Sequence, residues 1–316
     1  MSARAPLLSM QTISRISSVV LLIFAGTAAA AAESALRITT DVTFLAPDRA
    51  QKLDLYLPAP PADGKLSPAL VWIHGGGWSG GTKNEARAKN VCTTLAGAGY
   101  VAVSVDYRLG AGAWPTNLLD CKNAVRFLRA NAAKYRLDPH RIAVAGGSAG
   151  GHLALMVALT AGQKELEPAD AGTPYPGVSS AVRCVINMYG ITNILTRRTT
   201  DAKGKPGELR QLAESSLKLF GAESPESPVL RLASPVTHVT KSSVPMLTLH
   251  GKVDTTVDYA QAEELERVAR ERGASHELIL LEGAGHTFDL QTWSKKPLPR
   301  DLRPVMLEFL ARHMGR

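Results

Sequence analysis

The chain has 316 residues, of which 45% are hydrophobic and 20% are charged. This balance is typical of a folded globular protein and excludes a disordered or collagen-like chain. The formal net charge of +8 affects solubility and does not by itself indicate a nucleic-acid partner. The three cysteines, at positions 92, 121 and 184, are too few and too widely spaced for a disulfide framework or a metal cluster. The length allows one large α/β domain or two small ones, so the order of the predicted elements must decide.

The first 32 residues have the pattern of a secretory signal peptide. Arg4 and Arg15 precede an uncharged run over residues 16–32 that ends in repeated alanines. Because this apolar run is too short for a comfortable membrane span, we expect cleavage, a secreted or periplasmic location, and no stable membrane span afterwards. An uncleaved N-terminal anchor is the alternative. Cleavage would leave residues 33–316 with 34 basic and 28 acidic side chains, a net charge of +6.

Strand and helix patterns alternate along most of the remaining chain. Residues 36–44 and 51–57 alternate apolar with polar side chains, which predicts an antiparallel pair of strands. Short apolar runs predict buried strands at residues 69–74, 100–107, 141–145, 182–188, 246–250 and 277–281. Helical spacing predicts helices around residues 118–128, 149–161, 259–270 and 300–313. A further helix is expected after Thr82, whose spacing to Glu85 is that of a capping box.

This alternation predicts an α/β fold with a mostly parallel central sheet and helices on both faces, in a single domain over residues 33–316. Residues 191–235 interrupt the pattern with a polar stretch at 197–208, a predicted helix near 208–220 and several prolines. We interpret this segment as a partial lid that crosses the edge of the sheet.

A candidate nucleophile, Ser148, lies in the sequence GGSAG at residues 146–150, which matches the GxSxG motif. The motif falls where a predicted buried strand meets a predicted helix. The flanking glycines remove Cβ atoms that would clash in the sharp turn that such a nucleophile needs. The alternative is a serine that only caps the helix.

A glycine loop, HGGGW at residues 74–78, follows the first predicted core strand. Its glycines allow backbone N–H groups to point into a site, as in the oxyanion hole that stabilises a tetrahedral intermediate. We expect the N–H donors to come from Gly76 and Gly77, and from Ala149 after the nucleophile. A phosphate-binding loop is the competing interpretation, but no lysine follows in the P-loop pattern.

The base and the acid are expected late in the chain. His286 lies in a glycine-rich loop directly after a predicted strand, and Asp254 lies in a loop four residues after another. Asp258 precedes a predicted helix and is better explained as its N-cap. The resulting order is Ser148, Asp254, His286, which is the order of the α/β-hydrolases and differs from those of chymotrypsin and subtilisin.

Five motifs carry a family resemblance: HGGGW at 74–78, DYRL at 106–109, GGSAGGHLA at 146–154, HGKVD at 250–254 and GAGHTF at 283–288. Together they resemble the serine esterase and lipase branch of the α/β-hydrolase superfamily. Hormone-sensitive-lipase-like members carry a helical cap before the HGGG loop, whereas only the strand pair at 36–57 precedes it here. The chain is therefore more similar to the bacterial acetylxylan and feruloyl esterase-like (BD-FAE type) group.

The motifs and the resemblance together imply acyl transfer through an acyl-enzyme, in which Ser148 attacks an ester carbonyl, His286 moves the proton and Asp254 orients the imidazole. The resemblance implies acetyl or feruloyl esters of carbohydrates, or small soluble esters, as substrates, with Trp78 in the substrate pocket and no cofactor or metal. Amide hydrolysis of the formamidase or peptidase type is the alternative. A binding protein on a retired hydrolase scaffold would lack a triad member, and none is missing. The fold also predicts Cys92 and Cys121 on opposite faces of the sheet, without a disulfide between them.

Overall fold

An eight-stranded sheet organises the chain from Leu36 onward. The computed structural model describes residues 1–2, 36–168, 173–211 and 214–315, so the predicted signal peptide, apart from Met1 and Ser2, lies outside the described residues. The strands are β1 (Arg37–Val42), β2 (Leu53–Leu57), β3 (Ser67–Ile73), β4 (Val101–Val105), β5 (Leu137–Gly147), β6 (Val185–Met188), β9 (Met246–Gly251) and β10 (His276–Leu281). Their order across the sheet is β1-β2-β4-β3-β5-β6-β9-β10. The β1–β2 and β2–β4 pairs are antiparallel and the other pairs are parallel, which confirms the predicted mostly parallel sheet.

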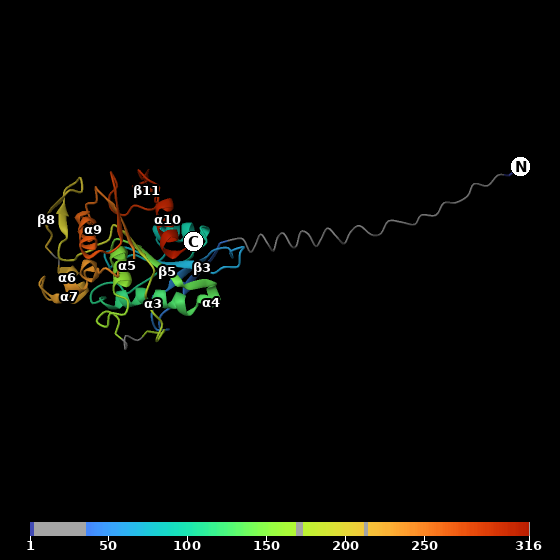
Figure 1. Ribbon diagram of the computed structural model, residues 1–316, viewed down its shortest axis with the longest axis horizontal. Coiled ribbons are helices and arrows are strands. Elements are labelled where there is room, and N and C mark those ends of the chain that lie inside the picture. Colours follow the sequence, from blue (N-terminus) through green and yellow to red (C-terminus); the bar gives the residue numbers. More distant parts are fainter. Residues whose placement is uncertain (3–35, 169–172, 212–213, 316) are drawn as a thin grey trace. The chain divides into compact units, whose positions relative to one another are not determined.

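Helices cover both faces of this sheet, because its parallel strands are apolar on both sides. Every residue of β3, β4 and β9 is buried. One apolar cluster joins one face to α3 (Thr116–Ala130), α5 (Ala149–Leu159) and α9 (Ala260–Arg272). The other cluster joins the opposite face to α2 (Ala86–Gly97) and α10 (Leu302–Met314). In Figure 1, α3 and α10 accordingly lie on opposite sides of β3 and β5.

The three cysteines lie inside these apolar layers. All three are buried and free. Cys92 belongs to the cluster beneath α2, and Cys121 belongs to the cluster beneath α3. The prediction that these two residues lie on opposite faces without a disulfide is therefore confirmed.

Two helix starts differ from the prediction. The helix after Thr82 begins at Ala86 with Glu85 as its N-cap residue and without a side-chain cap, because the Thr82 hydroxyl instead faces the Asp106 carboxylate at 3.3 Å. Asp258 was predicted to cap α9, but α9 begins after Tyr259, and the Asp258 carboxylate accepts a hydrogen bond from the Arg198 N–H at 2.7 Å. Both capping predictions were wrong: each side chain contacts a partner distant in sequence, and neither accepts an N–H group of the helix that it was predicted to cap.

The segment over residues 191–235 contains a small hairpin that the sequence pattern did not predict. Its strands are β7 (Arg198–Thr200) and β8 (Pro206–Leu209). The predicted helix near 208–220 is shorter, as α6 (Glu214–Phe220), and α7 (Pro228–Leu232) follows it, just before α8 (Pro235–His238). Hydrogen bonds from Arg197 and Thr200 to backbone carbonyls at residues 255 and 256 attach the hairpin to the loop after β9. Movement of this segment as a lid stays a prediction.

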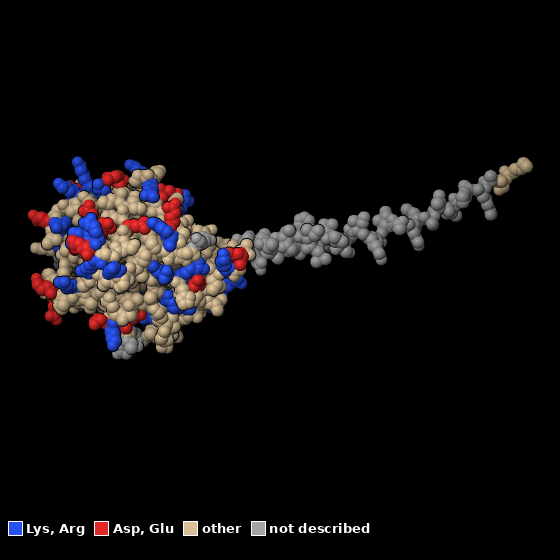
Figure 2. All heavy atoms as spheres, in the orientation of Figure 1, with Lys and Arg blue, Asp and Glu red and all other residues tan. Residues whose placement is uncertain are grey.

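The molecular surface carries charges of both signs. Figure 2 shows basic and acidic side chains interspersed over the face in view, so the positive net charge is not gathered there into one patch. Among the described residues, no helix has the length and apolarity needed to cross a membrane.

Candidate active site

The structure brings the three predicted catalytic side chains into one hydrogen-bonded chain. Ser148 follows β5, Asp254 follows β9 and His286 follows β10, and the carboxyl ends of these parallel strands share one edge of the sheet. His286 Nε2 lies 2.9 Å from Ser148 Oγ, and His286 Nδ1 lies 2.7 Å from Asp254 Oδ2. Because an ionised carboxylate only accepts hydrogen bonds, Nδ1–H donates to Asp254, and Nε2 is then free to accept the serine proton.

Ser148 sits on a strained turn between β5 and α5. Its φ of 57° and ψ of −123° lie outside the regions that L-residues prefer. The Ser148 N–H donates to the Met188 carbonyl at 2.9 Å, which fixes the turn against β6. A Cβ added to Gly150 would lie 2.1 Å from the Ile73 carbonyl oxygen, so only glycine permits this approach of α5 to β3.

The predicted oxyanion loop lies beside the nucleophile. A Cβ built on Gly75 would be 3.3 Å from the Ser148 Cβ, which places the loop against Ser148. Gly76 and Gly77 have φ values of 111° and 58°, which glycine adopts without steric cost. Within the described part of the chain, no acceptor receives the N–H groups of Gly76, Gly77 or Ala149. These three donors are therefore available to a bound oxyanion.

Asp254 is held as an ionised acceptor. Its side chain is fully buried, and Oδ1 accepts hydrogen bonds from the N–H groups of Thr256 and Val257 at 2.8 and 2.9 Å. Burial alone raises the pKa of this carboxyl, but hydrogen bonds from His250 and His286 outweigh burial and hold the pKa well below its ordinary value of 3.8. The His250 contact, at 3.3 Å, was not predicted from the sequence.

Two further aromatic residues, Trp293 and Tyr189, position His286, and neither was predicted from a sequence motif. The Trp293 indole N–H donates to the His286 carbonyl at 3.0 Å. The Tyr189 ring meets the His286 imidazole edge to face at 5.0 Å, and its hydroxyl donates to the Phe288 carbonyl. Tyr189 lies about 100 residues before the loop that it contacts, and Trp293 lies in a short segment after that loop. A local sequence pattern could therefore predict neither contact.

The predicted substrate residue Trp78 lines the site and is also anchored behind it. Its side chain is buried, and the indole N–H donates to His152 Nδ1 at 3.2 Å. His152 Nε2–H in turn donates to the Ala233 carbonyl at 2.7 Å. Burial lowers the pKa of His152 to about 4, so the ring is neutral near pH 7 and can serve as both acceptor and donor. Trp114 also contacts His152, and its ring packs against Phe220.

An open cleft of about 440 Å³ leads to Ser148. Its apolar lining comes from Trp78, Ile191 and Val257, and its polar lining includes four further side chains: Glu85, Arg87, Arg197 and Thr256. The cleft therefore offers a small apolar wall and a charged, hydrogen-bonding wall around the same nucleophile.

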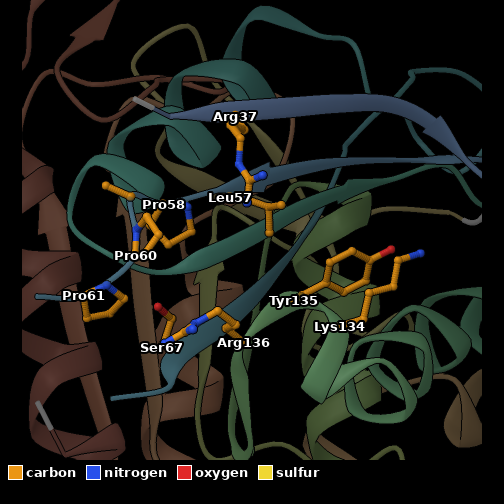
Figure 3. A pocket seen from close by; sticks show the side chains of 10 residues that line it. Arg37, Leu57, Pro58, Pro60, Pro61, Ser67, Lys134, Tyr135 and Arg136 are labelled. Atoms are coloured by element: carbon orange, nitrogen blue, oxygen red, sulfur yellow. The ribbon is translucent and has the colours of Figure 1, made fainter. Parts of the chain in front are cut away.

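A second hollow lies at the opposite edge of the sheet (Figure 3). Its lining includes Ser67, the first residue of β3, and the end of α4 (Ala132–Tyr135) with Arg136, which follows it. Because β3 and β5 are parallel, this hollow lies at the start of β3, away from Ser148. It measures only about 50 Å³. Among the described residues, no group of three His, Cys, Asp or Glu side chains could hold a metal ion.

The fold and the site together define an α/β-hydrolase, in which Ser148 follows β5 and Asp254 and His286 follow later strands. The BD-FAE family model matches residues 53–268, and the chain belongs to that family. The match includes Ser148 and Asp254 and ends before His286.

This chain is also similar, in sequence or in fold, to known esterases. The chain is 35% identical over 249 residues to esterase LipC of Mycobacterium tuberculosis, covering 77% of this chain and 58% of LipC. A truncated carbohydrate esterase from gut microbiota has the same fold, with a TM-score of 0.76 at 24% identity over 90% of this chain and 98% of that one. A propionate-bound esterase 2 from Thermogutta terrifontis gives a TM-score of 0.65 at 25% identity over 90% of this chain and 95% of that one.

Proposed function

We propose that this protein is a carboxylic ester hydrolase in which Ser148, His286 and Asp254 are the catalytic triad. The observation that carries the proposal is the continuous hydrogen-bonded chain from Ser148 Oγ to the buried Asp254 carboxylate. The free N–H groups of Gly76, Gly77 and Ala149 beside it supply an oxyanion hole. The similarity to LipC, which is named an esterase, supports the same reaction.

The reaction proceeds in two halves. Ser148 Oγ attacks the ester carbonyl carbon as His286 Nε2 takes the hydroxyl proton, and the N–H donors stabilise the negative oxygen of the tetrahedral intermediate. His286 then returns the proton to the leaving alcohol as the acyl-enzyme forms. In the second half, water attacks the acyl-enzyme through the same steps, and the acid is released as Ser148 regains its proton. Asp254 remains ionised throughout, since its role is to hold the tautomer and stabilise the imidazolium.

We propose that the substrates are acetyl or feruloyl esters of carbohydrates, and that small soluble esters are hydrolysed as well. The support is the two-sided cleft, because Trp78 and Ile191 can pack against an acyl chain while Arg197 and Thr256 offer polar partners to an alcohol with several hydroxyls. Acetylated xylan, feruloylated oligosaccharide and nitrophenyl esters of rising chain length, assayed side by side, would rank these classes. Equal rates on matched amides would favour the amide-hydrolase alternative instead.

The triad is tested with Ser148→Ala and a matched control, Ser79→Ala. Ser79 is an exposed serine on the glycine loop whose side chain takes no part in the mechanism. We expect Ser148→Ala to abolish hydrolysis of p-nitrophenyl acetate and labelling by a fluorophosphonate probe, while Ser79→Ala retains both. Wild-type activity in Ser148→Ala would refute the triad. Absence of both activity and labelling in the wild-type protein would favour a binding protein on a hydrolase scaffold.

We also propose that the protein is exported and loses residues 1–32. The support is the uncharged run over residues 16–32 after two arginines. N-terminal sequencing of protein recovered outside the cytoplasm should begin near Glu33. A sequence that begins at Met1 would favour the uncleaved anchor.

A further inference from the structure

Two arginines, Arg87 and Arg197, lie on the charged wall of the cleft that leads to Ser148. They come from positions 110 residues apart, in α2 and just before β7. Arg87 Nη2 donates to the Thr287 carbonyl at 3.1 Å, and Arg197 Nη2 donates to the Thr256 carbonyl at 2.9 Å. Thr287 belongs to the loop of His286, and Thr256 belongs to the loop of Asp254, whose carboxylate contacts His286 Nδ1. Both guanidinium groups are therefore attached to the loops that hold the imidazole and its carboxylate partner.

The hydrogen-bonding capacity of both groups is largely unused. In the described part of the chain, Arg87 Nε and Arg197 Nε are buried without a hydrogen-bond partner, and each side chain makes one hydrogen bond although a guanidinium carries five N–H donors. Arg87 has a distant ion pair, with Nη1 3.5 Å from Glu85 Oε1. Arg197 has no carboxylate of the described residues within 4.0 Å.

A structural role alone does not account for Arg197. One neutral donor would satisfy the Thr256 carbonyl, whereas a partly buried guanidinium that no carboxylate contacts directly is costly to keep in a fold. Burial lowers the pKa of Arg197, although an arginine stays protonated in proteins. The cleft wall therefore holds two positive charges and one negative charge. Arg197 is the positive group that makes no ion pair with a described carboxylate, since Asp254 and Asp258 attract it only from beyond 4.0 Å.

The position of these groups indicates which half of an ester they would meet. His286 Nε2 delivers its proton to the leaving alcohol, so the alcohol half lies on the histidine side of the site. The planar guanidinium matches a carboxylate in a two-point hydrogen bond. We propose that the preferred substrates are esters whose alcohol half carries a carboxylate, as in an acylated acidic sugar, and that Arg197 is the residue that selects them. This inference rests on the proposed esterase function.

The test compares two acetyl esters that differ only in charge: 4-(acetoxymethyl)benzoate and its neutral amide, 4-(acetoxymethyl)benzamide. A second pair, the nitrophenyl monoester of succinate and nitrophenyl butyrate, places the charge in the acyl half instead. Wild-type protein should prefer the benzoate over the benzamide in kcat/KM and show no such preference for the succinate ester. The preference should decrease as the salt concentration is raised from 0.05 to 0.5 M, because exposed charges are screened.

The variants are Arg197→Gln, Arg197→Lys and the matched control Arg198→Gln. Arg198 is the exposed neighbour of Arg197 and does not line this cleft. Since a hydrogen bond to a charged group is worth about 1.5–3 kcal/mol, we expect Arg197→Gln to lower kcat/KM for the benzoate by roughly 10- to 100-fold. The benzamide rate should fall by a much smaller factor than the benzoate rate, Arg197→Lys should retain part of the preference, and Arg198→Gln should change neither rate.

Each other outcome overturns the inference. Equal losses on both esters in Arg197→Gln would give Arg197 a structural role only. A wild-type protein without preference for the benzoate, or with preference for the succinate ester, would refute a carboxylate site on the alcohol side. The salt series uses only the wild-type protein, so it tests the inference even if the Arg197 variants do not fold. If the benzamide and nitrophenyl esters are hydrolysed through Ser148 in all these cases, the proposed function stands and only this inference fails.

Discussion

Gly150, the second residue of α5, is a position where the structure leaves almost no room for a side chain. A Cβ built there lies 2.1 Å from the Ile73 carbonyl oxygen and 2.5 Å from the His74 carbonyl oxygen, whereas real Cβ atoms essentially never approach within 3.0 Å. Both oxygens are backbone atoms at the end of β3, where the oxyanion loop begins. The substitution Gly150→Ala must therefore move α5 and this loop apart by about 1 Å.

The displacement changes both stability and catalysis. Overpacking a core contact costs about 1–3 kcal/mol, and for a domain of this size such a cost lowers the melting temperature by about 2–12 °C. A misplacement of about 1 Å between catalytic groups costs about 10²-fold in rate. Since Ser148 and the loop donors lie on opposite sides of the contact, we expect kcat/KM for p-nitrophenyl acetate to fall by about 100-fold. All three triad side chains remain present.

Gly97→Ala is the matched control. Gly97 ends α2, has no atom within 4 Å of its added Cβ and lacks a positive φ. Alanine there should leave kcat/KM unchanged and keep or slightly raise the melting temperature, because Ala costs less backbone entropy than Gly in a helix. Esterase assays and thermal unfolding of both variants measure the contrast. A Gly150→Ala protein that behaves like Gly97→Ala would refute the close-approach argument.

Three further predictions follow from buried polar groups. Asp254→Asn should lower kcat by about 10⁴-fold without loss of folding, because an amide favours the wrong tautomer of His286; a loss below tenfold in steady-state assays would contradict this. His152 has a folded pKa of about 4 against 6.5 when unfolded, so the folded state loses up to about 3 kcal/mol as the pH falls from 6.5 to 4. Urea unfolding of His152→Gln across that range should show a flatter profile than wild type. Glu167 pairs with the buried Lys122 at 3.0 Å, so Glu167→Gln should cost about 3–5 kcal/mol in thermal or urea unfolding while leaving kcat/KM unchanged.

Short-range patterns were sufficient to predict much of the sheet and the residues of the candidate site. Each predicted catalytic residue follows a strand of the parallel sheet, and the ends of such strands meet at one edge whatever the loops between them do. Ser148 was the clearest case, because the strained turn demands glycines in its immediate neighbours. His286 and Asp254 could be placed once the strands before them were recognised.

The wrong predictions involve side chains whose partners are distant in sequence. Thr82 and Asp258 both have the composition and spacing of helix caps, yet their side chains face Asp106 and the Arg198 N–H instead. A capping hydrogen bond contributes about 1 kcal/mol, so a tertiary partner of similar strength is enough to displace it. The β7–β8 hairpin escaped prediction for a related reason, since its polar strands are held by the loop after β9 and not by an apolar face of their own.

The contacts that set the electrostatics of the site were the least accessible to sequence reasoning. His250 and Asp254 are four residues apart, but their interaction depends on the turn that brings the carboxylate back toward the strand end. Arg87 and Arg197 line one cleft because Arg87 in α2 is bonded to the loop of His286 while Arg197, just before β7, is bonded to the loop of Asp254. Neither arginine lies in a motif, and in the sequence each resembles an ordinary surface arginine. Selectivity for a charged substrate would therefore reside in parts of the chain that lie outside the catalytic motifs, so proteins with the same triad can differ in the esters they prefer.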